Sequence, residues 1–272
     1  MKHLLGVCEW SLPVNGPGAV ALAAKAGFDG IQIGDLGGAE QGYPMNSPAV
    51  QEAYLQAAEE HRVVLHSLHP YGLQRTGGML FPTDTPQGRQ GMKDVVKCIE
   101  ACEAMHIPVL MVSSFFATLL RNEWDFDAFA QQLRHACRVG RDHGVRVVYE
   151  SVLSPARIRR MIEAADGGLT ICYDTLNPIR WGTGDPLEEI PALLPYIDHF
   201  HVKDAPFDLK GYAPLGEGRG RFREAAEVIR SAGYEGWLVS ENYYTTLSAV
   251  TGRDFLELAK RDLSVIREHF TD

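Results

Sequence analysis

Short apolar runs alternate along the chain with longer segments in which hydrophobic residues recur at helical spacing. Most of the apolar runs are continuous, which is typical of parallel strands covered on both faces. Eight strands are predicted, near Leu4–Cys8, Gly30–Ile33, Val63–Leu68, Val109–Val112, Val145–Tyr149, Leu169–Tyr173, Ile197–Val202 and Trp237–Ser240. Eight helices are predicted between and after them, over Pro17–Ala26, Ala49–His61, Gly88–Met105, Phe126–His143, Pro155–Ala165, Asp185–Leu194, Arg223–Ala232 and Asp254–His269.

The eightfold repetition of strand and helix predicts an α/β fold, a closed (β/α)₈ barrel of the TIM type. A doubly wound open sheet would usually carry a glycine-rich fingerprint after its first strand, and Cys8–Pro13 is not one. We expect one domain over residues 1–272, because no linker divides the chain and barrels of this type have about 250 residues. The helix-poor stretches Leu73–Thr85 and Ala205–Gly220 follow strands and are expected to form substrate walls or lids at the barrel mouth.

The composition, 45% hydrophobic and 22% charged, is ordinary for a globular protein. The apolar runs are shorter than the roughly 20 residues that span a bilayer, and the N-terminus lacks a signal-peptide pattern. We therefore expect no membrane contact and a cytoplasmic location. The net charge of −9, without a long basic cluster, argues against a nucleic-acid partner. The five cysteines lack a framework spacing, which favours reduced thiols.

Four polar residues stand at the ends of four successive predicted strands. They are Glu150, Asp174, His201 and Glu241. In a parallel barrel the carboxyl ends of the strands meet at one mouth, so these side chains are expected to converge. Any one of them alone is more simply a solvated loop residue or a charge at a helix start. Together, three carboxylates and an imidazole predict a site for one divalent metal ion, which is Mn, Mg, Co or Zn.

The motifs around these residues are similar to those of a known superfamily. The order Glu, Asp, His, Glu, the strand end His201–Asp204 and the loop Leu215–Gly218 together resemble the xylose isomerase-like, sugar phosphate isomerase/epimerase superfamily over nearly the whole chain. Inosose dehydratases, hydroxypyruvate isomerases, dehydroshikimate dehydratases and an apurinic endonuclease branch belong to the same group. The resemblance implies that the four strand-end residues bind one metal ion. It also implies that Glu150 and Glu241 are the catalytic acid–base pair, and which of them removes the proton stays open.

A divalent ion at such a site holds two neighbouring oxygens of a hydroxyketone and stabilises the enediolate that forms on proton loss. We therefore expect a sugar isomerase or epimerase that abstracts a proton next to a carbonyl through a metal-bound enediolate. The substrate is then a small sugar or polyol. Two alternatives remain. One is a dehydratase or lyase on a keto-polyol of the inosose or dehydroshikimate type, and the other is a sugar-binding homologue without turnover.

The chain departs from the superfamily pattern at two positions. Asn177 stands where many members have a histidine three residues after the strand-six aspartate, and Phe207 stands where the ketose epimerases have an arginine. Asparagine still donates a hydrogen bond to a sugar oxygen, and Lys203 or Arg219 is a candidate for the arginine's role. The missing histidine and the acidic charge argue against the three-metal endonuclease branch.

Further substrate contacts are expected at the ends of strands one and three. His66 and His69 close strand three, and histidines at this place commonly face substrate in the superfamily. Glu9 follows strand one, beside Trp10, which forms either an apolar wall or part of the packed rim. The segment 216–221 is either a phosphate-binding loop or a glycine-built turn. The resemblance also leaves a homodimer open.

Overall fold

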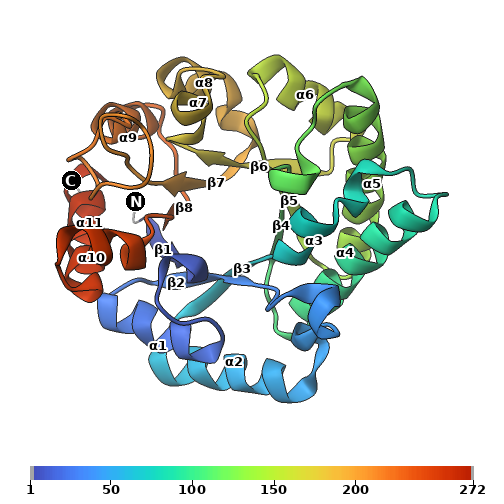
Figure 1. Cartoon of the computed structure of the whole chain (residues 1–272), viewed down its shortest axis with the longest axis horizontal. Coiled ribbons are helices and arrows are strands. Elements are labelled where there is room, and N and C mark those ends of the chain that lie inside the picture. Colours follow the sequence, from blue (N-terminus) through green and yellow to red (C-terminus); the bar gives the residue numbers. More distant parts are fainter. Residues whose placement is uncertain (1–2, 271–272) are drawn as a thin grey trace. The chain divides into compact units, whose positions relative to one another are not determined.

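The computed structural model describes residues 3–270, and its eight strands form one closed parallel barrel in the order β1 to β8 (Figure 1). This confirms the predicted (β/α)₈ fold. The predicted domain limits, residues 1 and 272, lie outside the described residues, and the extent of the domain stays a prediction. The strands are β1 Leu4–Cys8, β2 Gly30–Gly34, β3 Val64–His69, β4 Val109–Ser113, β5 Arg146–Glu150, β6 Leu169–Asp174, β7 Ile197–Val202 and β8 Trp237–Ser240.

The helices lie between and after the strands, and each predicted helix is present with its ends shifted by at most three residues. The helices are α1 Pro17–Ala26, α2 Pro48–His61, α3 Tyr71–Thr76, α4 Pro86–Ala104, α5 Glu123–Asp142, α6 Pro155–Ala164, α7 Asn177–Trp181, α8 Pro186–Leu193, α9 Phe222–Ser231, α10 Tyr244–Thr251 and α11 Phe255–Phe270. The short helices α3, α7 and α10 were not predicted. Helices α3 and α7, with six and five residues, are too short for a helical period to stand out.

The two stretches predicted to be helix-poor differ in the structure. Within Leu73–Thr85, the first residues complete α3 and Gly78–Leu80 form a 3₁₀ turn, so the prediction was wrong there. Ala205–Gly220 is described throughout and contains no helix, as predicted. Among the described residues, no helix is both long and apolar enough to cross a membrane.

The described chain divides into two compact units. The first unit comprises the described residues of Met1–Gln32, Ala57–Val64 and Cys172–Asp272. In it β1 pairs with β2 and with β8, and β8 pairs with β7, so the first and last strands lie side by side (Figure 1). Helix α11 packs against α1, α9 and α10. This unit carries most of the predicted site residues.

The second unit comprises Ile33–Gln56 and Leu65–Ile171. Here β4 pairs with β3 and β5, and β5 pairs with the first half of β6. Helix α5 packs against α4 and α6. The five residues of β4 are all buried, which explains why this strand appears as a continuous apolar run.

In strand β7, successive side chains point to opposite faces, and its two histidines share one face. Phe200 points to one face, where its ring packs 4.7 Å from that of Tyr234. His199 and His201 share the opposite face, and both are fully buried. Lys203 follows with the same parity, just beyond the strand end. The polar residues in this otherwise apolar strand therefore gather on one side of it.

Candidate metal centre

Three predicted metal ligands come together in the first unit. Asp174 is the last residue of β6, His201 is the fifth residue of β7, and Glu241 directly follows β8. All three are buried, and one ligand atom of each lies within 4.8 Å of those of the other two. His201 Nδ1 and Glu241 Oε2 are 3.6 Å apart. The predicted convergence of these three strand ends is therefore present.

Lys203 carries its ammonium group into this cluster. Its Nζ lies 2.8 Å from Asp174 Oδ2 and donates a short hydrogen bond to Glu241 Oε2. The side chain is buried, so this ion pair is poorly screened by water. Lys203 was predicted as a substrate contact, and in this structure its partners include two predicted metal ligands. The carboxylates are thus arranged to hold positive charge between them.

The other oxygen of each carboxylate is held by the protein. Asp174 Oδ1 accepts hydrogen bonds from the backbone N–H groups of Leu176 and Asn177, at 2.8 and 2.7 Å. Glu241 Oε1 accepts a hydrogen bond from the indole N–H of Trp10, at 2.9 Å. Each carboxylate therefore has one oxygen fixed by a neutral donor and one turned toward Lys203. Trp10 is part of the polar site, beyond the two roles expected from the sequence.

The electrostatics of Glu241 follow from these contacts. Burial raises the pKa of its carboxyl, but the charge of Lys203 opposes burial and holds the pKa well below its usual range. Glu241 is therefore an ionised carboxylate at neutral pH. An ionised carboxylate is a good ligand for a divalent cation and a weak proton acceptor.

His201 is held from its other ring edge. Its Nε2 lies 2.7 Å from Gln32 Oε1, and Cys8 Sγ lies 3.4 Å from the same oxygen and 3.8 Å from the ring nitrogen. The register of β1 and β2 pairs Cys8 with Gln32, which brings both side chains to His201. The ring is therefore fixed between strand β2 on one edge and Glu241 on the other.

The loop after β7 is organised by Asp204. Its Oδ1 accepts from the N–H groups of Ala205 and Gly220, and its Oδ2 accepts from those of Gly216 and Gly218, at 2.7 to 3.0 Å. A Cβ atom at Gly218 would lie 2.3 Å from Asp204 Oδ1, so a larger residue there collides with this carboxylate. Of the two readings of segment 216–221, the structure therefore favours the glycine-built turn, because these three glycine N–H groups bind Asp204.

The remaining predicted contacts of the first unit lie in different settings. Asn177 is the buried first residue of α7. Glu9 is buried, and its Oε1 accepts from the N–H of Gly16 just before α1, which ties down the segment after β1. Arg219 is exposed, with its guanidinium 5.5 Å from the ring centre of the exposed Phe207. Contact of these residues with substrate stays a prediction.

The predicted residues of the second unit are all buried, and they lie on strands β3 and β5. His66 Nδ1 lies 2.9 Å from Ser67 Oγ, and His69 Nδ1 donates to the carbonyl oxygen of Met111 at 3.0 Å. The His69 ring centre also lies 4.6 Å from that of Tyr71. Glu150 is the last residue of β5. His69 and Glu150 lie at the strand ends that the sequence predicted for them, whereas His66 lies in the middle of β3, and the roles of all three stay predictions.

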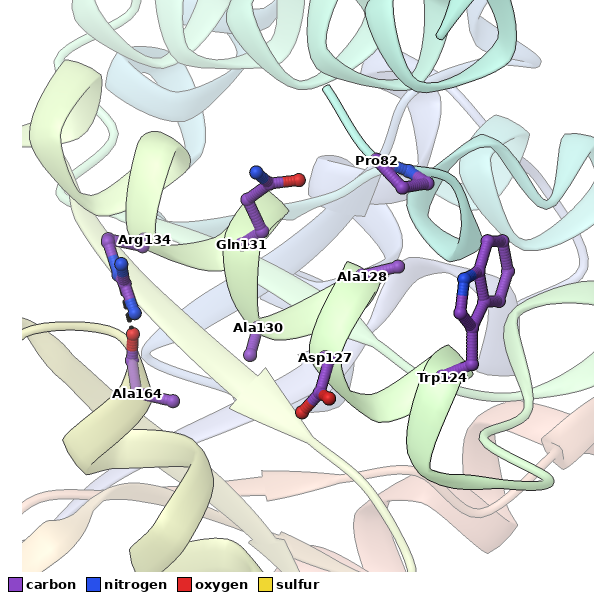
Figure 2. A pocket seen from close by; sticks show the side chains of 8 residues that line it. All are labelled: Pro82, Trp124, Asp127, Ala128, Ala130, Gln131, Arg134 and Ala164. Carbon is purple, nitrogen blue, oxygen red and sulfur yellow. Dashed lines mark hydrogen bonds between the residues drawn. The ribbon is translucent and has the colours of Figure 1, made fainter. Parts of the chain in front are cut away.

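The second unit also has a cleft of about 430 Å³ along α5 (Figure 2). Its two charged side chains already have partners. Arg134 donates to the carbonyl oxygen of Ala164 at 2.7 Å, and Asp127 pairs with Arg160 at 3.3 Å. Trp124, half exposed, forms one end of the cleft. The lining holds one carboxylate and neither histidine nor cysteine, so we assign it no chemistry.

Two of the residues that shape the centre had no role in the sequence-based account. Gln32 lies inside an apolar strand, where a buried amide must find a hydrogen-bonding partner, and that burial is the signal that marks it. Asp204 belongs to the motif His201–Asp204, but its partners lie more than ten residues further along the chain. Only the folded loop shows them.

Comparisons with known proteins match the chain to one family over most of its length. The family model described as a xylose isomerase-like TIM barrel matches residues 20–269. A 2-epi-5-epi-valiolone 7-phosphate 2-epimerase from Actinoplanes sp. is 31% identical over 271 residues, which are 98% of this chain and 97% of the relative. An inosose dehydratase from Bacillus thuringiensis is 23% identical over 142 residues, 44% of this chain and 47% of the relative. A solved L-ribulose 3-epimerase superimposes with a TM-score of 0.79 at 16% identity, covering 99% of this chain and 95% of that chain, and shares the fold.

Proposed function

The chain belongs to the xylose isomerase-like TIM barrel family, as its motifs predicted, and on this premise we propose that it is a sugar epimerase or isomerase that depends on one divalent metal ion. The observation that carries the proposal is the buried cluster of Asp174, His201 and Glu241 around the ammonium group of Lys203. Buried carboxylates that converge on a cation are costly to assemble, and such clusters are typical of metal and catalytic sites.

The residues present fit a divalent ion. Asp174 Oδ2, His201 Nδ1 and Glu241 Oε2 are the donor atoms that would hold it, since the second oxygen or nitrogen of each side chain is bound elsewhere. We propose Glu150 as a fourth ligand. It ends β5, which pairs in parallel with β6, and neighbouring parallel strands end on the same side. This mixed oxygen and nitrogen set suits Mn, Mg, Co or Zn.

The proposed chemistry is proton transfer at a carbon next to a carbonyl group. The bound metal would supply the positive charge that makes this carbon acidic. Epimerisation removes the proton from one face of the carbon and returns it to the other, so it requires two groups. We assign these roles to Glu150 and Glu241, with an enediolate between the two transfers. The low pKa of Glu241 makes it a weak base, and this assignment therefore depends on an acidified substrate.

The proposed substrate is a small polyhydroxylated ketone. The name of the 31% identical relative describes epimerisation at carbon 2 of a 7-phosphate, so a phosphorylated substrate belongs to the proposal. Because the N–H groups of Gly216, Gly218 and Gly220 are bound to Asp204, a phosphate group would need side-chain cations. Arg219, exposed on the same loop, is the candidate.

The test is solvent-deuterium incorporation by the manganese-reconstituted protein. The panel contains 2-epi-5-epi-valiolone 7-phosphate, free ketoses, inososes and dehydroshikimate, and the products are read by NMR and mass spectrometry. The expected result is one deuteron at the carbon next to the carbonyl, without loss of mass from the carbon skeleton. Glu241→Gln should abolish incorporation, while Glu257→Gln, an exposed glutamate on α11, should not. Incorporation that survives removal of the metal would overturn the proposal.

Dehydration is the second candidate, and the similarity to inosose dehydratases favours it. It begins with the same proton removal and then expels a hydroxyl group from the next carbon. Loss of water from an inosose in the same assay would identify the chain as a lyase. Ligand binding without exchange would instead identify a sugar-binding homologue.

A further inference from the structure

We propose that Gln32 is a positioning residue that fixes His201 as the tautomer with its proton on Nε2, and so directs the Nδ1 lone pair toward Asp174 and Glu241. This inference deepens the proposed function, on whose metal centre it rests. The tautomer itself is a property of the protein without metal, and it is therefore testable alone.

The contact between Gln32 and His201 determines which atom donates. Both side chains are fully buried, and His201 Nε2 lies 2.7 Å from Gln32 Oε1. An amide oxygen only accepts hydrogen bonds, so the ring nitrogen must donate. The thiol of Cys8 donates to the same oxygen at 3.4 Å.

The consequence appears at the other edge of the imidazole. A neutral imidazole has one N–H and one lone pair, so a proton on Nε2 leaves the lone pair on Nδ1. Nδ1 is the nitrogen that lies 3.6 Å from Glu241 Oε2. A metal-binding histidine needs its lone pair on the side of the other ligands, and a hydrogen bond from the opposite nitrogen fixes it there. Gln32 supplies the acceptor for that hydrogen bond.

The sequence around Gln32 supports a specific role. It is the only polar side chain of β2, Gly30–Gly34, in which every residue is buried. A buried amide costs free energy unless it is hydrogen-bonded, and a methionine of similar length would fill the same space without that cost. Packing alone therefore does not account for glutamine at this position. The need of His201 for a hydrogen-bond acceptor does account for it.

Two substitutions separate positioning from packing. Gln32→Met keeps the length and removes the acceptor, whereas Gln32→Glu keeps an acceptor oxygen and should rescue the tautomer. The matched control is Gln132→Met on α5, where another fully buried glutamine donates to the carbonyl oxygens of Phe81 and Gly88. It removes a buried amide from the second unit and leaves the surroundings of His201 unchanged.

The experiment is ¹⁵N NMR of the histidine-labelled, metal-free protein at alkaline pH, followed by titration with ¹¹³Cd²⁺. We expect the His201 proton on Nε2 and protected from exchange, and, with cadmium bound, ¹¹³Cd coupling to Nδ1. Gln32→Met should lose the fixed tautomer and bind cadmium about 10- to 100-fold more weakly. Gln32→Glu and Gln132→Met should behave as wild type.

A proton on Nδ1 in the wild type would overturn the inference, as would a Gln32→Met protein with the wild-type tautomer. A Gln32-dependent tautomer in a protein that binds no cadmium would support the inference and count against the proposed metal centre. The two proposals can therefore fail separately.

Discussion

Two groups of buried carboxylates adjoin at two points of the chain, where Lys203 precedes Asp204 and Glu241 precedes Asn242, and they are neutralised in different ways. The strand-end cluster consists of Asp174, His201, Lys203 and Glu241, and its carboxylates face a cation. The loop clasp consists of Asp204, Asn242 and Asp262, and its carboxylates face backbone N–H groups and one side-chain amide, with Arg261 beside Asp262. Burial raises the pKa of Asp204 and Asp262, whereas the charge of Lys203 holds that of Glu241 low.

The difference shows that neighbouring residues in the chain serve different purposes, one in the candidate site and the next in holding a loop. Lys203 and Glu241 point into the cluster, while the next residues, Asp204 and Asn242, belong to the clasp. Asn242 Oδ1 accepts from the N–H of Asp204, and its Nδ2 donates to Asp262 at 2.7 Å. The clasp therefore fastens the loop after β7 to α11 directly behind the cluster. A carboxylate that faces a cation is suited to exchange that cation, and one enclosed by N–H groups is suited to hold a loop.

The largest expected effect is on catalysis, from Glu241→Gln. The substitution removes the charge of a proposed metal ligand and proton-transfer group, so kcat/KM should fall about 10²- to 10⁴-fold. Steady-state kinetics on the substrate found in the deuterium assay measure it, with Glu257→Gln as the control. An effect below tenfold would place Glu241 outside the reaction.

Next in size is the effect of Asp204→Ala on stability. The substitution leaves four backbone N–H groups without their acceptor, and the free energy of unfolding should fall by about 3 kcal/mol. Urea denaturation measures this. Asp208→Ala is the matched control, because Asp208 is an exposed residue of the same loop and should change stability by less than about 0.5 kcal/mol. Equal losses of stability in the two variants would mean that Asp204 holds the loop no better than an exposed aspartate does.

The pH dependence of stability tests the clasp from another side. Burial raises the pKa of Asp262 to about 6 from its ordinary 3.8, so the folded state binds this proton more tightly than the unfolded state. The contribution of Asp262 to the free energy of unfolding should therefore be largest below about pH 4. It should fall by about 3 kcal/mol in total as the pH rises through about 6. Urea denaturation of wild type and Asp262→Asn across this range isolates the contribution. A constant difference between the two proteins would show that Asp262 does not titrate there.

The smallest expected effect is that of Trp10→Phe. It removes the indole donor to Glu241 Oε1 and keeps most of the aromatic surface. One hydrogen bond to a charged group is worth about 1.5 kcal/mol, so kcat/KM should fall about tenfold, with the melting temperature nearly unchanged. Trp124→Phe on α5 is the matched control and should leave kinetics unaltered. An equal loss in both variants would mean that the indole N–H does not orient Glu241.

The sequence predicts this molecule best where the physical signal is local or repeated. Continuous apolar strands and regular helix spacing give the barrel, and the barrel topology then places Asp174, His201 and Glu241 at strand ends. The contact between Gln32 and His201 depends on the register of β1 and β2 and on side-chain rotamers, which no sequence period specifies. The four N–H groups around Asp204 likewise require the loop to be folded. The pattern of strands and helices therefore predicts that Asp174, His201 and Glu241 lie at the barrel mouth. It does not predict the hydrogen bonds that orient them.

The most direct test of the metal centre is anomalous diffraction from crystals grown with manganese. The account predicts one anomalous peak bonded to His201 Nδ1 and to carboxylate oxygens of Asp174, Glu241 and Glu150, with the Lys203 ammonium displaced from its present position. His201 Nε2 should still donate to Gln32. A structure in which Lys203 keeps both carboxylates and no manganese lies among these residues would contradict it.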